Sequence, residues 1–237
     1  MSSMQPLESS SFLDNRWNNL YLTGSIAALG IVIFIPLQII IFILYPPPTT
    51  VIGWFELFQN NRVAGLLDLD LVLIIDQIFF GLILLALFIK LHQFEKSFSL
   101  IAFIIGLMGV ISYFSSTIAF EMMSLSDQYA SATTETEKNN LLIAGQMLII
   151  RWTGTSYVIG YLLLGISFLI FGLVMLRSSD FSKTTAYLGI VSGVLSLVPA
   201  SFGTIGLIFA FLSLIPLELW CLVLSLNFYR FSKRKRR

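Results

Sequence analysis

Charged residues are scarce in this chain of 237 residues. Asp, Glu, Lys and Arg make up only 11% of it, whereas they make up about 25% of a typical soluble protein. Hydrophobic residues make up 57%, and they occur in long runs rather than in the alternating or amphipathic patterns of soluble strands and helices. A soluble fold of this length could not bury so much apolar surface. The composition therefore predicts an integral membrane protein.

Histidine and cysteine are almost absent. The one histidine, His92, excludes a three-histidine zinc site and an intrachain bis-histidine haem. The one cysteine, Cys221, excludes an intrachain disulfide, and its apolar neighbours predict a buried small side chain. The sequence has no Walker loop, dinucleotide fingerprint, HExxH or GxSxG motif, which disfavours ATP-driven transport by this chain alone and familiar intramembrane protease chemistry. We expect no metal and no cofactor.

Six apolar runs approach or exceed the roughly 20 residues that a helix needs to cross a bilayer. They lie at about 22–45, 69–91, 98–120, 146–176, 184–200 and 207–229. The predicted fold class is therefore an all-α polytopic membrane protein with six transmembrane helices. The predicted organisation is an N-terminal tail at 1–21, a transmembrane domain at 22–230 and a basic tail at 231–237.

The distribution of basic residues predicts the orientation. If the N terminus is cytoplasmic, every Lys and Arg lies on the cytoplasmic side except Arg62, Lys138 and Arg151. This asymmetry follows the positive-inside rule and predicts that both termini are cytoplasmic in a multi-pass protein of the cell membrane. The C-terminal "RFSKRKRR" is typical of an anchor beside anionic lipid headgroups. Membrane lipids are the expected surroundings, and no nucleic acid partner is expected.

The two long outer loops contain helix signals of their own. Three prolines at 46–48 end the first span, and the following "WFELF" predicts a short interfacial helix. Thr134 and Glu137 fit a capping box, so the fourth helix should begin outside the membrane. The pairs Gly189 with Gly193 and Gly24 with Ala28 predict close helix packing. That packing would occur either within one chain or in a homo-oligomer or complex with another membrane protein.

Three charged residues lie within the predicted spans. They are Asp76, Arg151 and Glu218, and a charge at the bilayer centre costs about 2.5–3.5 kcal/mol even on insertion scales. Counting about 1.5 Å per residue, Asp76 and Arg151 lie at a similar depth, and Glu218 lies deeper. We therefore expect Asp76 to hold Arg151, with Glu218 as a second possible partner. The same depths speak against a dyad of Asp76 and Glu218.

This ion pair has two readings that the sequence leaves open. It either fixes how two helices dock, or it belongs to a binding site. The second reading draws on polar residues at neighbouring levels, which suggest a polar cavity open to the outer face. The candidate ligand-binding residues are then Arg151, Asp76, Glu218, Glu121, Tyr157 and Gln146. A cation site of Asp68, Asp70 and Glu121 is less expected than acids that complement a helix dipole.

Three stretches resemble a known family. They are "WFELFQNNRVAGLLDLDL", "SSTIAFEMMSLSDQYASATTETEKNNLLIAGQ" and "VMLRSSDFSKTTAYLGIVSGVL". Over residues 50–196 the chain is similar to prokaryotic multi-pass membrane proteins of the domain of unknown function 4386 family or a near relative. The resemblance implies a small helical membrane protein of bacteria or archaea, and it implies no catalytic or binding residues.

Three functions remain as hypotheses. The first is binding of a small or lipid-like ligand, anionic if it meets Arg151, for transport or sensing. The second is a structural or accessory protein that packs against other membrane proteins. The third, which we favour least, is a lipid-modifying enzyme that uses the carboxylates, because no nucleophile and base pair is recognisable. A non-enzymatic role is expected, with no catalytic residues assigned.

Overall fold

The computed structural model describes residues 17–233, and the regular elements in that range are all helices. They are α2 (Asn18–Leu44), α3 (Val51–Asn60), α4 (Arg62–Leu66), the π-helix η1 (Leu67–Leu71), α5 (Val72–Leu91), α6 (Lys96–Phe114), α7 (Ala119–Ser131), α8 (Glu135–Trp152), α9 (Thr155–Arg177), α10 (Lys183–Leu195) and α11 (Gly203–Lys233). The all-α class is confirmed over this range. Helices already include residues 18–21 and 231–233, which were predicted as tail, and the rest of both predicted tails lies outside the described residues.

Five helical stretches are long and apolar enough to cross a membrane. They are Asn18–Leu44, Arg62–Leu91, Lys96–Ser131, Glu135–Arg177 and Gly203–Lys233. The remaining predicted span, 184–200, contains only the 13 residues of α10, a length of about 20 Å against a hydrocarbon core of about 30 Å. The described residues therefore include five full-length candidate spans and one helix of about two thirds of that length, and six spans are not confirmed.

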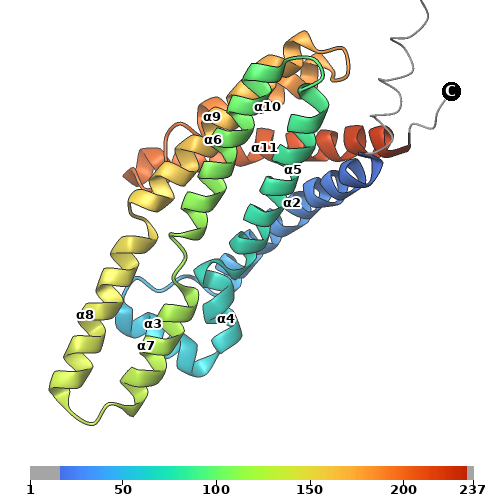
Figure 1. The fold of residues 1–237 in the computed structure, drawn as a ribbon. Coiled ribbons are helices and arrows are strands. Elements are labelled where there is room, and N and C mark those ends of the chain that lie inside the picture. The colour runs from blue at the N-terminus through green and yellow to red at the C-terminus, as the bar shows by residue number, and fades with distance from the viewer. Residues whose placement is uncertain (1–16, 234–237) are drawn as a thin grey trace, which may run out of the picture.

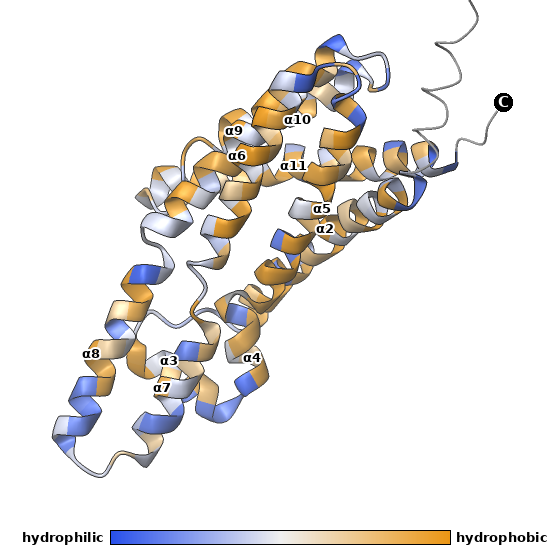
Figure 2. Cartoon of the chain, in the orientation of Figure 1, coloured by the Kyte–Doolittle hydropathy of each residue, from blue (hydrophilic) through white to orange (hydrophobic). Residues whose placement is uncertain are grey.

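The helices form two regions with separate cores (Figure 1). We call α2, α5, α6, α9, α10 and α11 the bundle, and α3, α4, α7 and α8 the lobe. The bundle core contains large side chains from each of its full-length spans, among them Leu84, Phe171 and Trp220. The lobe core is smaller and centres on Trp54, Phe55, Val51 and other residues of α3 and α7. Figure 2 shows a mainly hydrophobic bundle and a lobe with many hydrophilic residues.

Two of the connections that join the bundle to the lobe run from α6 to α7 and from α8 to α9. In the first the helix ends and the chain turns, and in the second the helix breaks at Thr153 and Gly154. The predicted spans 98–120 and 146–176 each run across one of these breaks. Thr134 caps α8, since its Oγ1 accepts a hydrogen bond from the amide of Glu137 at 3.2 Å. The capping prediction is therefore confirmed, and the helix that it starts belongs to the lobe.

Small residues bring the bundle helices into close contact. Ser25 on α2 and Ser225 on α11 each donate a hydroxyl hydrogen bond to the other's backbone carbonyl, at 2.8 and 2.9 Å. A Cβ at Gly193 of α10 would lie 2.6 Å from the backbone oxygen of Gly165 on α9. Glycine is therefore required at this crossing, and the predicted small-residue contacts occur within one chain. The start of α2 and the end of α11 also lie side by side.

The first outer loop contains a helix where one was predicted. It is α3, whose N-cap is Thr50. Trp54, Phe55 and Phe58 on α3 are only 1–2% exposed, because they pack into the lobe core rather than facing outward. Trp54 meets the ring of Trp152 edge to face, with 6.0 Å between centroids. The helix is present, and its interfacial position remains a prediction.

Candidate functional site

Arg151 does not pair with Asp76. Its side chain is exposed, and its Nη2 donates a hydrogen bond to the backbone carbonyl oxygen of Ser115 at 2.8 Å. Ser115 follows α6, whose 19 residues span about 28 Å, close to the thickness of the hydrocarbon core. Arg151 therefore lies at the lobe end of the bundle rather than inside it. The depth estimate was wrong because it took 146–176 as one membrane span, whereas α8 extends away from the bundle.

Asp76 and Glu218 are buried without partners. Asp76 is 1% exposed, and neither of its carboxylate oxygens has a hydrogen-bond partner within the described part of the chain. Glu218 is half-buried as a residue, but both of its carboxylate oxygens are buried and unpartnered in the same way. The two groups lie close enough for their charges to interact. No hydrogen bond between described residues reaches either carboxyl group, so the structure shows no hydrogen-bonded dyad of Asp76 and Glu218.

A cavity of about 260 Å³ lies inside the bundle. Its walls come from α2, α5, α6, α9, α11 and the residue after α10, with Ile35, Leu73, Phe80, Leu164 and Leu217 among its apolar lining. The lining residues lie in the C-terminal half of α2, the N-terminal halves of α5 and α11, the end of α6 and the first two thirds of α9. α10 ends at Leu195, and Ser196 directly after it lines the cavity. A ligand in this space would be surrounded mainly by hydrocarbon side chains.

Two glutamines, Gln38 and Gln77, contribute polar side chains to the cavity lining. Gln38 and Gln77 are each 4% exposed, and the Oε1 atom of each is buried with no hydrogen-bond partner. The amide nitrogen of Gln38 is used, since it donates to the carbonyl of Leu67 at 3.2 Å. Buried polar atoms normally find a partner. The wall of this mainly apolar cavity therefore includes two glutamine side chains whose acceptor oxygens are unused by the described residues.

Three tyrosines lie along the lobe side of the cavity. Tyr113 and Tyr161 line it, and Tyr157 lies next to both rings at centroid distances of 5.4 and 6.2 Å. The hydroxyls of Tyr161 and Ser213 are 3.3 Å apart, so the polar end of Tyr161 is bound to α11. Tyr157 is thus the one predicted site residue that contacts residues of the cavity wall.

The other predicted site residues lie elsewhere. Glu121 is exposed on α7 and lines a separate open groove between α7 and α8. Gln146 is exposed on α8. Arg151, Asp76 and Glu218 do not line the cavity, although Asp76 and Glu218 each directly neighbour a lining residue, Gln77 and Leu217. The predicted set is therefore not gathered into one polar cavity. No group of three or more potential metal ligands occurs among the described side chains, to which that of Asp70 does not belong.

The sequence analysis missed two polar features. The first is Gln38, a polar residue within an apolar run, which is itself a signal that it faces the protein interior. The second is an ion pair at the other end of the bundle. Lys90 Nζ lies 3.2 Å from Asp180 Oδ2 and 4.8 Å from the ring centroid of Phe231, and its side chain is only 4% exposed. Lys90 was predicted at the cytoplasmic end of the span 69–91, and Asp180 was predicted in the loop that follows the span 146–176.

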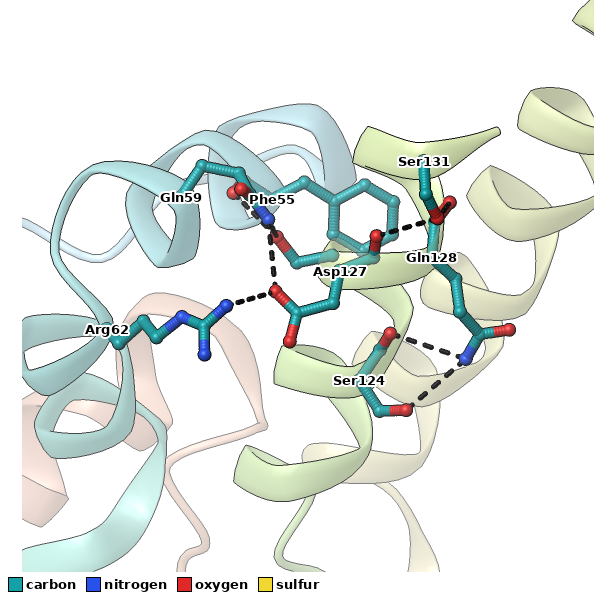
Figure 3. Close-up of polar contacts among 8 residues, drawn as sticks. Phe55, Gln59, Arg62, Ser124, Asp127, Gln128 and Ser131 are labelled. Atoms are coloured by element: carbon teal, nitrogen blue, oxygen red, sulfur yellow. Dashed lines mark hydrogen bonds and ion pairs between the residues drawn. The ribbon is translucent and has the colours of Figure 1, made fainter. Parts of the chain in front are cut away.

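Polar contacts in the lobe hold α3 and α4 against α7 (Figure 3). Arg62 Nη2 lies 2.7 Å from Asp127 Oδ1, and Gln59 Nε2 donates to Ser126 Oγ at 3.0 Å. The hydroxyl of Ser126 donates in turn to the carbonyl of Phe55 at 2.8 Å. These groups are all used within the lobe, so the network reads as structural and leaves the bundle cavity as the candidate site.

The bundle and its surface define the class of this protein. Apolar side chains point outward from every full-length span, for example Ile26, Ile43 and Ile208, at 61%, 71% and 52% exposure, as expected of surfaces that face lipid. The chain is a multi-pass helical membrane protein. It belongs to the family described as domain of unknown function 4386, whose profile matches residues 20–229. The match confirms the resemblance and extends it beyond residues 50–196. No curated protein and no solved structure matches the chain.

Proposed function

We propose that this protein binds a lipid-like molecule with a hydrogen-bond donor in the bundle cavity. The observation that carries the proposal is the pair of buried amide oxygens, on Gln38 and Gln77, in a cavity with an otherwise mainly apolar lining. A hydroxyl or amine headgroup would satisfy both acceptors, and an acyl or isoprenoid chain would fill the apolar part. An anionic headgroup is disfavoured, since Arg151 is not in the cavity wall and the amide oxygens would repel it.

The first test compares headgroups on one chain length. Purified protein in lipid nanodiscs would be heated with dodecanol, dodecylamine or dodecanoate, and the unfolding midpoint would be measured. We expect dodecanol or dodecylamine to raise the midpoint, and dodecanoate to leave it unchanged, because ligands stabilise the state to which they bind. If none of the three probes raises the midpoint, the binding proposal is wrong and the structural role remains.

Two variants connect any effect to the cavity. Gln77→Leu keeps the size of the side chain and removes an unsatisfied polar atom, so the protein should fold normally and lose its preference for the alcohol. Leu73→Phe should fill the cavity and reduce binding of all chains. Gln146→Leu, an exposed position on α8, is the matched control and should bind as the unmodified protein does. Equal dodecanol binding in all three variants would place the alcohol elsewhere.

A further inference from the structure

The middle of the bundle contains two acidic residues and no basic residue. Between the first and last turns of α2, α6, α9 and α10 there is no charged residue, and in α5 and α11 the interior ones are Asp76 and Glu218. The basic residues of these six helices all lie at the end away from the cavity. They are Lys90, Lys96, Arg177, Lys183, Arg230 and Lys233. Lys90 is already paired with Asp180.

The surroundings of Asp76 and Glu218 offer no substitute for a cation. Ionisable groups from the helices packed around them carry no positive charge: Asp68 of η1, Tyr113 of α6, Tyr157 and Tyr161 of α9, Tyr187 of α10, and Cys221 of α11, with none inside α2 between Tyr21 and Tyr45. Cys221 is fully buried, and it lies within electrostatic range of both carboxyl groups. No described hydrogen bond reaches either carboxyl group.

Two bare carboxylates at this depth are physically untenable. An ionised carboxylate that is buried without hydrogen bonds loses its hydration and gains nothing in return. The charge of a second carboxylate within electrostatic range would add to this cost. Protonation neutralises each carboxylate, and the described residues supply neither a cation nor a hydrogen-bond donor that would stabilise its charge.

We propose that Asp76 and Glu218 are proton-binding sites inside the bundle. Each buried carboxyl group carries its proton at neutral pH. Because Gln77 and Leu217 are the neighbours of these acids in sequence and line the cavity, both sites lie directly beside the cavity. This inference does not depend on the cavity binding a ligand.

Infrared spectroscopy tests the protonation directly. Exposed carboxyl groups are ionised at about pH 7, so a carbonyl stretch of protonated carboxyl at that pH reports buried acids. We expect this band in the unmodified protein, and we expect it to shrink in both Asp76→Asn and Glu218→Gln. Asp68, which is also buried and unpartnered, would account for a remainder that Asp68→Asn removes. Glu121→Gln, at an exposed position, is the control and should leave the band unchanged.

Stability against pH supplies the second measurement. The folded protein would hold protons that the unfolded chain releases above about pH 4, so its unfolding midpoint should fall as the pH rises from about 4 to about 7. Asp76→Asn/Glu218→Gln imitates the protonated pair, and it should fold and show a flatter pH profile. A band that the double variant leaves intact would overturn the proposal. So would a band that disappears when sodium chloride replaces choline chloride, since the pair would then be a sodium site.

Discussion

Different interactions hold the helices together in the bundle and in the lobe. In the bundle, helices meet through glycine and serine, and the described side chains within its middle form no ion pair. In the lobe, aromatic side chains fill a small core and exposed polar side chains connect neighbouring helices. This is the difference expected if lipid surrounds the bundle and water reaches the lobe. Lipid offers no hydrophobic driving force between apolar helices, so that close contact must stabilise them, whereas water favours burial of apolar side chains.

The largest expected contrast is between glycines of the two regions. Gly193→Ala would place a Cβ 2.6 Å from backbone atoms of Gly165 and Leu169, which cannot yield without moving α9. We expect a loss of about 3 kcal/mol or more in unfolding free energy, measured by denaturant titration in mild detergent. In the lobe, a Cβ at Gly145 would meet a side-chain methyl group of Val51 at 2.4 Å, so Gly145→Ala should cost less.

Gly81→Ala is the matched control for this contrast. Its added Cβ would have no atom within 4 Å, and alanine favours helix more than glycine does. The variant should be as stable as the unmodified protein or slightly more stable. If Gly145→Ala destabilises the protein more than Gly193→Ala does, the two regions do not differ in the way described.

A smaller effect is expected from the buried ion pair at the far end of the bundle. Lys90→Met removes the partner of Asp180, which is about one-third exposed, so water would relieve part of the cost. We expect a loss of about 2 kcal/mol, measured by the same titration. Lys90→Met/Asp180→Asn should regain most of it. A double variant as unstable as the single one would mean that contact with the Phe231 ring, rather than charge, stabilises this end.

The smallest effect is expected for the ion pair of the lobe. Arg62 and Asp127 are 60% and 42% exposed, and exposed pairs contribute about 0.5 kcal/mol. Arg62→Gln should therefore leave global stability almost unchanged and increase hydrogen exchange in α3 and α4 alone. The Lys138 pair with Glu135, which is still more exposed on the acid side, serves as a reference. Faster exchange throughout the bundle would show that the lobe and the bundle unfold as one unit.

The sequence predicted the class of fold and much less of the site. Long apolar runs identify spans because only a helix satisfies its backbone in lipid, and the Thr134 capping box identified the start of α8. Counting along a span assumes that the helix stays in the membrane, and this assumption fails for α8. Arg151 was therefore predicted too deep in the membrane, and the predicted ion pair between Arg151 and Asp76 is not formed.

The cavity could not be predicted because it depends on how six segments meet. Gln77 was noticed as a polar residue, but Gln38 carried no signal beyond its isolation in an apolar run. Apolar lining residues such as Leu73 and Leu164 cannot be told from ordinary packing residues until the structure shows that α10 stops short. The burial of Glu218 likewise depends on how α11 packs against α2 and α10, which the position of its apolar run does not give.

The early end of α10 leaves the cavity bordered on one side by the residue that begins a turn. The helix stops at Leu195, and the chain reverses through a turn in which Gly203 adopts a φ of 65° and a Cβ at Gly206 would lie 2.2 Å from the carbonyl oxygen of Pro199. A longer α10 would narrow this space without a change in the other helices that line it. Family members in which this helix continues for two more turns are expected to have a solid core in place of the cavity.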